Sequence, residues 1–197
     1  MILLAWAKSQ NMPKIDANFD YIQIDAPRLD ETCEAYFKWK DLNTYVSRVS
    51  TRGINMPDVI SEPIGCWCLD LLWSRGSGVT GDGYNPRTHQ RIEFKATSNF
   101  QEDLSSFGPK CEFDDLVFLR FNLENNLVYV YDLHLDNENF GNYPANKSQT
   151  IEDQKKQGRR PHVSLYKLFV KQSDGTERKP DIIFDIRRQK IVEDNRK

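Results

Sequence analysis

The sequence lacks a long apolar run and a basic leader, the features that a membrane span or an export signal requires. Its opening stretch, residues 1–7, is apolar but far shorter than the roughly 20 residues that cross a bilayer. We therefore expect a protein of the cytoplasm that has no membrane segment.

Cysteine is scarce and is not arranged for metal binding. None of the four cysteines forms a C-x-x-C pair, and no cluster of cysteine or histidine accompanies Cys66 and Cys68 to complete a zinc site. The spacing favours buried, reduced thiols. His89 and His134 stand alone in the sequence, so no histidine framework for a metal is indicated.

An excess of positive charge is also missing, since the formal net charge is −2 and the pI is about 6.0. Proteins that coat DNA passively are usually basic all over, so this balance disfavours that class. It leaves a nuclease open, because an enzyme can concentrate carboxylates at a metal site and keep its positive charge in one cleft.

The chain does contain enough for one ordinary domain. Its 197 residues are 39% hydrophobic and 12% aromatic, which suffices for a core and argues against disorder. No internal repeat or low-complexity linker divides it. We expect a single domain over residues 1–197.

Hydrophobic periodicity predicts helices in the first part of the chain. Residues 31–49 have an amphipathic pattern, and the expected broad face comprises Cys33, Tyr36, Phe37, Lys40 and Tyr45. A second helix is expected to begin near Ser61 as its cap, with Pro63 in the first turn, and to continue to the glycine turn at residues 76–78.

Alternation of apolar and polar residues predicts a sheet in the middle of the chain. Strands are expected at residues 22–24, 79–84, 90–97, 116–121, 127–133 and 182–186, and a helix start at residues 150–153. Residues 163–170 fit either a helix or a strand. These elements predict an α/β fold with a central mixed β-sheet flanked by helices.

Three charged residues in this sheet suit phosphodiester hydrolysis. Glu93 and Lys95 are two apart on one strand and therefore share a face, and Asp82 joins them if residues 82 and 93 lie on paired strands. Mg²⁺ prefers carboxylates and other oxygens, so Asp82, Glu93 and the backbone carbonyl of Phe94 are its candidate ligands. Lys95 can orient or deprotonate the attacking water, or neutralise the phosphate.

The spacing alone is not specific. An E-x-K triplet arises by chance about once in a chain of this size, and Glu177-Arg178-Lys179 also matches it. That second copy lies in a polar turn, which we interpret as a solvated loop. The first copy alternates with Ile92 and Phe94, although an exposed sheet face with a cross-strand salt bridge would give the same pattern.

The wider context resembles a family of type II restriction endonucleases within the PD-(D/E)xK superfamily. The resemblance covers about a third of the chain well, between residues 60 and 121. It rests on the segments Ile60-Ser61-Glu62, Gly81-Asp82-Gly83-Tyr84-Asn85-Pro86, Arg91-Ile92-Glu93-Phe94-Lys95-Ala96, and residues 103–110 and 116–121. Residues 157–161 are similar with less specificity. One departure is Gly81, which stands where the superfamily label has proline.

This resemblance implies a restriction-endonuclease-like core and Mg²⁺-dependent cleavage of both strands of double-stranded DNA at a short specific site. It implies Asp82 and Glu93 as metal ligands and Lys95 as the catalytic lysine. Glu62 is a further candidate, offered to the metal directly or through water; a carboxylate in the first turn of a helix is the equal alternative. The nearest relatives are expected among enzymes that cut short GC-rich palindromes with a central unspecified base.

Two basic segments are candidates for contact with DNA. The denser one contains Lys155, Lys156, Arg159, Arg160 and His162, with Gly158 and Pro161 indicating a loop. Its alternative is a solvated run of charge. The second segment, residues 105–110, offers small residues and Lys110. We therefore divide the domain into a catalytic core at about 57–135 and a DNA-contacting part at about 145–190.

Two other functions fit the same residues. A repair or junction-resolving nuclease of this fold would prefer branched or mismatched DNA, and a non-cleaving DNA-binding module would need neither metal nor Lys95. For the restriction enzyme we expect a homodimer, because a palindromic site carries two-fold symmetry.

Overall fold

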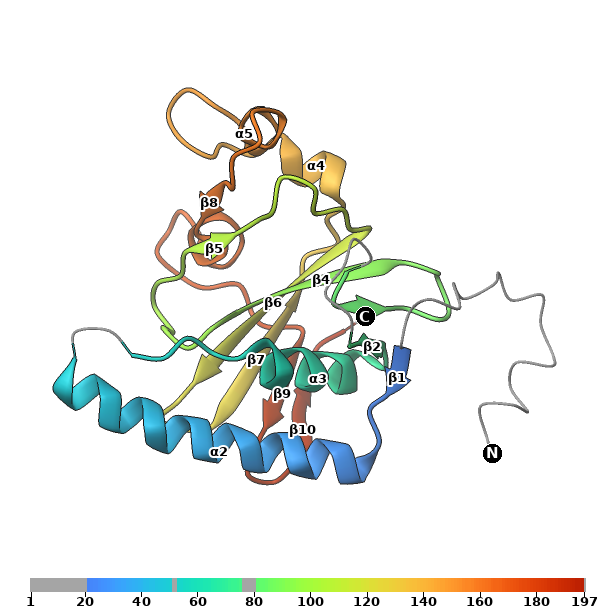
Figure 1. Ribbon diagram of the computed structural model, residues 1–197, viewed down its shortest axis with the longest axis vertical. Helices are drawn as coiled ribbons and strands as arrows, with labels where there is room; N and C mark the ends of the chain where they lie inside the picture. The colour runs from blue at the N-terminus through green and yellow to red at the C-terminus, as the bar shows by residue number, and fades with distance from the viewer. Residues whose placement is uncertain (1–20, 51–52, 76–80, 197) are drawn as a thin grey trace.

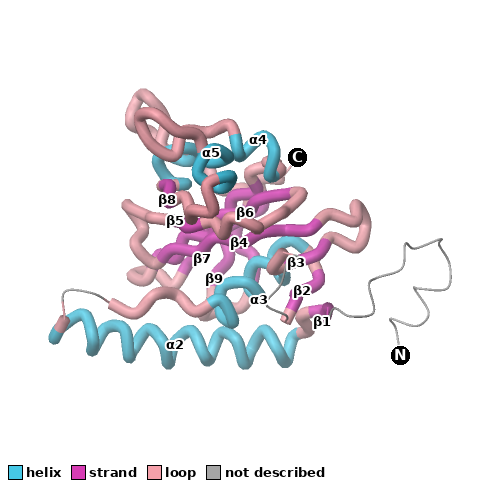
Figure 2. The backbone as a smooth tube through the Cα atoms, turned by 45° about the horizontal axis from the view of Figure 1, so that its top comes forward, coloured by secondary structure: helices cyan, strands magenta, loops and turns pink. Residues whose placement is uncertain are grey.

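An eight-stranded mixed sheet lies between two layers of helix and loop in the computed structural model, which describes residues 21–50, 53–75 and 81–196 (Figures 1 and 2). Its strands, in spatial order, are β1 (Tyr21–Gln23), β2 (Leu72–Ser74), β3 (Gly83–Tyr84), β4 (Arg91–Thr97), β6 (Asp115–Asn122), β7 (Leu127–Asp132), β9 (Ile182–Asp185) and β10 (Lys190–Asp194). β4 and β6 are parallel, and the other neighbours are antiparallel. The predicted fold class is confirmed.

The layer below the sheet in Figure 1 contains α2 (Ala26–Val49), whose first turn is capped by the Asp25 carboxylate. Leu29, Cys33 and Tyr36 are buried in the core that this helix shares with the sheet. Tyr45 was expected on the same face, but its side chain is 63% exposed. That expectation is wrong because the last turns of α2 extend past the strands of the sheet (Figure 1), so the Tyr45 side chain has no place in the core.

The second helix of this layer, α3 (Asp58–Leu69), begins three residues before the expected cap. Pro57 occupies the N-cap position, and the Ser61 hydroxyl instead donates to the Pro57 carbonyl oxygen at 3.3 Å. Pro63 consequently lies inside the helix. The helix ends at Asp70, which has a left-handed backbone (φ 56°), and the apolar residues after it form β2. A short apolar run fits a buried strand as well as a helix, so periodicity misassigned it. The expected glycine turn at residues 76–78 lies outside the described residues.

The layer above the sheet in Figure 1 contains α4 (Asn137–Gly141), α5 (Ile151–Lys156) and a π-helical turn, η1 (Tyr166–Val170). A small sheet of β5 (Ser105–Ser106) and β8 (His162–Val163) lies in the same layer. The predicted helix start at Thr150 is confirmed, since its hydroxyl accepts from Asp153 N at 3.1 Å in a capping box. The ambiguous residues 163–170 divide between β8 and η1.

Most of the expected strands are confirmed, namely β1, β4, β6, β7 and β9. The strand expected over residues 79–84 is described only as β3, and residues 79–80 lie outside the described part. β10 was not predicted because most of its residues are polar and exposed at the edge of the sheet. Among the described helices, none combines the length and the apolar character that crossing a membrane demands.

Candidate active site

A tight backbone arrangement brings Asp82 alongside β4. Gly81 adopts a φ of +79°, and Asp82 N donates to the Ile92 carbonyl oxygen at 2.8 Å. The Asp82 carboxylate then accepts a hydrogen bond from Phe94 N at 2.9 Å. The hairpin of β3 and β4 thereby holds Asp82 beside Glu93 and Lys95, as the sequence predicted for paired strands.

Glu93 and Lys95 project from one face of β4 and contact each other. The Lys95 ammonium lies 2.5 Å from Glu93 Oε1 and 5.1 Å from the centre of the Phe107 ring. Burial acts to lower the pKa of Lys95, but the carboxylates of Glu93 and Asp82 outweigh it, and the net pKa is raised. Lys95 is therefore a protonated cation at neutral pH.

Glu62 completes a group of three acidic side chains. It lies in the second turn of α3, and Trp73 Nε1 on β2 donates to its Oε2 atom at 2.8 Å. This geometry removes the alternative of a carboxylate in the first turn. Its helix packs against β4, where Gly65 lies against the Phe94 ring, and the charges of Glu93 and Lys95 both act on the pKa of Glu62.

The carboxylates in this group repel one another in a poorly solvated place. Burial, followed by the negative charges of Glu93 and Glu62, raises the pKa of Asp82 to about 8. Burial, with Asp58 and Glu93 adding to it against the Trp73 hydrogen bond, raises the pKa of Glu62 to about 7. One lysine does not balance this density of negative charge, so the site has the character of a cation-binding centre.

Asp82, Glu93 and Lys95 line a cleft of about 410 Å³. Lys110 and Arg160, two of the residues predicted to contact DNA, line the same cleft. Its remaining walls are formed by Gly81, Ser106, Gly108, Pro109, Cys111 and Glu112. The cleft therefore combines a buried and a half-buried carboxylate with basic side chains, which suits the binding of a cation and a phosphate together.

The basic segment predicted at residues 155–162 does not form one continuous surface. Lys155 is buried, and its ammonium donates to the Cys111 carbonyl oxygen at 2.7 Å and to the Asn137 side chain at 2.6 Å. One of these hydrogen bonds reaches Cys111, a residue that lines the cleft. Lys155 is therefore buried beside the cleft and does not lie with the exposed basic residues. Lys156, Arg159, Arg160 and His162 are exposed, and His162 belongs to β8.

Two residues of the site were not identified from the sequence. Cys111 was treated as one of four inert thiols, yet it lines the cleft, where burial and then the neighbouring Glu93 charge raise the pKa of its thiol to about 12. Trp73 was assigned to no site, since its strand was taken for helix. One sequence signal could have pointed to Cys111: the segment at residues 103–110, which belongs to the family resemblance, leads directly into it.

The second E-x-K copy has a structural role that its loop did not suggest. The loop around Glu177 is exposed as expected, but its carboxylate accepts from Arg120 Nη1 at 2.8 Å. Arg120 is fully buried, with the Phe100 and Tyr166 rings 4.0 and 4.5 Å from its guanidinium carbon. The prediction of a solvated loop is therefore confirmed, and the sequence did not reveal that Glu177 pairs with a buried arginine across it.

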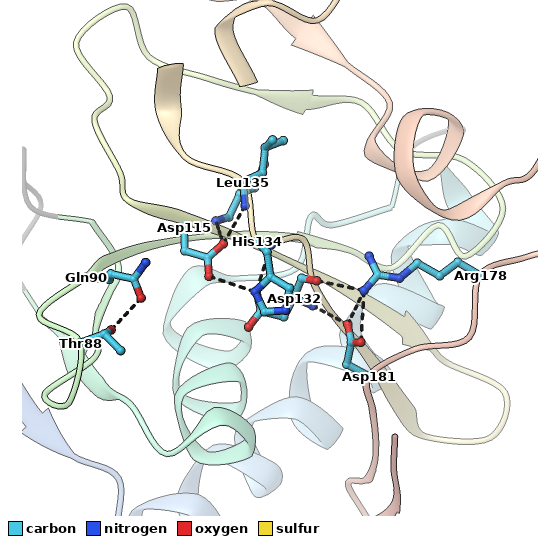
Figure 3. A network of polar contacts seen from close by, with 9 residues as sticks. Thr88, Gln90, Asp115, Asp132, His134, Leu135, Arg178 and Asp181 are labelled. Atoms are coloured by element: carbon cyan, nitrogen blue, oxygen red, sulfur yellow. Dashed lines mark hydrogen bonds and ion pairs between the residues drawn. The ribbon is translucent and has the colours of Figure 1, made fainter. Parts of the chain in front are cut away.

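A second acidic group lies outside the cleft, at the ends of β6 and β7 (Figure 3). It consists of Asp115, Asp132 and His134, whose ligand atoms lie within 4.8 Å of one another and could hold a metal ion. Burial, then the neighbouring charge of Asp132, raises the pKa of Asp115 to about 6. His134 is thus not isolated, contrary to the sequence analysis: its Nδ1 atom lies 3.1 Å from an Asp132 oxygen.

Comparison with known proteins agrees with this picture. The model of a family described as Bsp6I restriction endonuclease matches residues 24–172. A curated relative, the type II restriction enzyme Bsp6I of Bacillus sp. (strain RFL6), is 38% identical over 173 residues, which cover 88% of this chain and 97% of the relative. No solved structure matches the chain significantly. The family match includes every residue of the cleft.

Proposed function

The chain belongs to the Bsp6I restriction endonuclease family and is a type II restriction endonuclease, and from this premise we propose that it cuts DNA through Asp82, Glu93 and Lys95 with Mg²⁺. Enzymes of this type bind DNA and act with a divalent metal ion. We propose as substrate a short, GC-rich palindrome with a central unspecified base. Since its substrate is DNA, we assign the enzyme to the cytoplasm.

One observation carries the proposal: the Asp82 and Glu93 carboxylates and the Lys95 ammonium meet in a cleft that Lys110 and Arg160 also line. These donors fit Mg²⁺, which takes oxygen ligands. Asp82, Glu93 and the Phe94 carbonyl oxygen would hold the ion. Because Phe94 N donates to Asp82, and the N–H and C=O of one strand residue point to the same side, that carbonyl also faces Asp82.

When bound, Mg²⁺ supplies positive charge at the scissile phosphate and activates water for attack. Lys95 orients this water or neutralises the phosphate. Deprotonation of the water is the other role open to Lys95, for which the lysine would first have to lose its own proton. Lys110 and Arg160 line the same cleft, and we expect them to hold the phosphate there. Lys156, Arg159 and His162 lie exposed on adjacent segments, where we expect them to contact DNA beyond the cleft.

The first test combines substitution with a search for the site. Phage DNA is digested with Mg²⁺, and the fragment ends are sequenced to give the recognition site. Asp82→Ala, Glu93→Ala and Lys95→Ala should each reduce cleavage about 1,000-fold or more, because each removes a proposed cation ligand or the ammonium that contacts Glu93. In Ca²⁺, which blocks cutting, at least one variant should still bind the cognate duplex.

Glu177→Ala is the matched control, since Glu177 belongs to the second E-x-K copy and lies away from the cleft residues. It should retain specific cleavage at a temperature where the variant stays folded. Full activity of Lys95→Ala would falsify the catalytic assignment. Cleavage of branched DNA in preference to any duplex site would instead favour a structure-selective nuclease.

A further inference from the structure

Trp73 makes a contact that the proposed mechanism does not use. It lies on β2, is 9% exposed, and directs its one polar atom, Nε1, to Glu62 Oε2 at 2.8 Å. Among the described residues, no hydrogen bond engages the other carboxylate oxygen, Oε1. The indole therefore fixes one oxygen of Glu62 and leaves the second for another ligand.

The strand that carries Trp73 also holds the first cation ligand. Trp73 is the register partner of Gly83 on β3, and Ser74 N donates to the Asp82 carbonyl oxygen at 3.0 Å. β2 thus fixes Glu62 through a side chain and Asp82 through the backbone. These two carboxylates come from different elements, and β2 is in direct hydrogen-bond contact with both.

We propose that Trp73 is a positioning residue of the metal centre, whose indole N–H holds Glu62 in reach of the cation that Asp82 and Glu93 bind. This inference rests on the proposed function. A glutamate on a helix can adopt several rotamers, and crowding with Glu93 and Asp82 favours those that point away from the site. A hydrogen bond from a rigid, buried ring opposes that movement.

Hydrogen-bond partners of metal ligands have a known effect, since their loss usually weakens metal binding or activity about 10- to 100-fold. Trp73→Phe removes the N–H group and keeps an aromatic ring in the core. We expect half-maximal cleavage to need about 10-fold more Mg²⁺, with the rate at saturating Mg²⁺ largely recovered. A purely structural loss would lower the rate at every Mg²⁺ concentration.

The chain offers a close control. Trp39 is also buried, and its Nε1 atom donates to the Asn55 carbonyl oxygen at 3.1 Å, away from the cleft. Trp39→Phe therefore deletes an equivalent hydrogen bond without touching a carboxylate. Both variants should lose similar stability, but Trp39→Phe should keep the Mg²⁺ dependence of the parent enzyme.

Metal binding can be measured without catalysis from the rise in melting temperature of the full chain as MgCl₂ is added. Trp73→Phe should shift this titration to about 10-fold higher Mg²⁺. In a Glu62→Gln background, adding Trp73→Phe should produce no further shift, because the indole acts through that carboxylate. A further full shift in that background, or an unchanged titration in Trp73→Phe alone, would overturn the proposal.

A measurement on the unaltered protein guards against a variant that fails to fold. The indole ¹H–¹⁵N resonance of Trp73 should move on addition of Mg²⁺ with the midpoint seen in melting, and that of Trp39 should not. If the Trp73 resonance stays fixed while Mg²⁺ raises the melting temperature, the role of Trp73 is refuted and the proposed function still stands. If Mg²⁺ neither stabilises the protein nor supports cleavage, the proposed function itself fails.

Discussion

At the scale of single residues, Gly81 determines where Asp82 can lie. Residues other than glycine rarely adopt its backbone φ of +79°, and a Cβ atom at this position would lie 2.8 Å from the Ile92 carbonyl oxygen. Proline, which the superfamily label has at this position, is locked near φ of about −65° and would not fit. The departure from the label is thus a consequence of how this hairpin brings Asp82 to β4.

The raised pKa values of Asp82 and Glu62 predict how stability depends on pH without metal. Both carboxyls are protonated to a higher pH in the folded chain than in the unfolded one, about 8 and about 7 against ordinary values near 4. Between pH 4 and 8 the folded state therefore holds more protons, so the free energy of unfolding falls as pH rises. In EDTA, the melting temperature should decrease from about pH 5 to pH 8.

Asp82→Asn isolates this effect, because the amide has similar shape and does not titrate. The variant should melt at a temperature that depends less on pH, and at pH 8 in EDTA it should melt higher than the parent protein. Added Mg²⁺ should stabilise the parent more at pH 8 than at pH 5. A melting temperature that rises across this range in EDTA would contradict the assignment of crowded, metal-free carboxyls.

At the scale of elements, Asp103 joins two segments that are distant in the sequence and lie in the layer that contains β5 and β8. Its carboxylate accepts from Ser164 Oγ at 2.6 Å, Leu165 N at 2.9 Å and Tyr166 N at 3.0 Å, and also from Ser105 Oγ. Ser105 begins β5, which leads to Lys110, while Ser164 follows β8 and the loop that carries Arg160. Asp103 therefore ties together the two segments that bring basic side chains to the cleft.

We expect Asp103→Ala to destabilise the protein by about 2–3 kcal/mol, since hydrogen bonds to a charged group are lost together. Urea unfolding measures this change. Asp136→Ala is the control: Asp136 caps α4 alone, and its loss should cost about 1 kcal/mol. At a temperature where both variants are folded, Asp103→Ala should weaken binding of cognate DNA in Ca²⁺ more strongly. Equal binding by the two variants would limit Asp103 to stability.

The elements also show which inferences a sequence supports. The alternation at β4 fixed the faces of Glu93 and Lys95, because a buried strand must turn its charged residues to one side. The placement of Lys155 and Glu177 could not be predicted in this way. Both are charged residues in polar segments, and their partners, the Cys111 carbonyl and Arg120, lie 44 and 57 residues away in the chain. Local pattern contains no information about such contacts.

Local sequence pattern also accounts for only part of the active site. Asp82, Glu93 and Lys95 were predicted from spacing and resemblance, because the hairpin that joins them is a local structure. Glu62 came only from resemblance, and Trp73 was missed, since β2 was read as the end of a helix. Contacts between α3, β2 and β4 depend on how the elements pack, and one sequence does not determine that packing.

At the scale of the whole molecule, each chain has one copy of the cleft that Asp82, Glu93 and Lys95 line. A type II restriction endonuclease must cut both strands of the duplex. The strands of a duplex run in opposite directions, so one asymmetric cleft cannot engage both in the same orientation at once. A palindromic site repeats its contacts about a two-fold axis, and a C2 dimer matches that symmetry with one cleft for each strand. We therefore expect a homodimer as the cutting unit, visible by light scattering on the DNA complex in Ca²⁺.

A mixed dimer tests this expectation by its product. Subunits with two different tags, one carrying Lys95→Ala, are co-expressed, and the dimers that carry both tags are purified. Each such dimer has one intact cleft, so it should nick a plasmid at the recognition site and stop. We expect the altered subunit to bind its half of the site, and this contact would keep the intact cleft from turning to the second strand. Linear plasmid formed at the parent rate, or one subunit per site in light scattering with both strands cut, would mean that a single cleft serves both strands and would refute the dimer as the cutting unit.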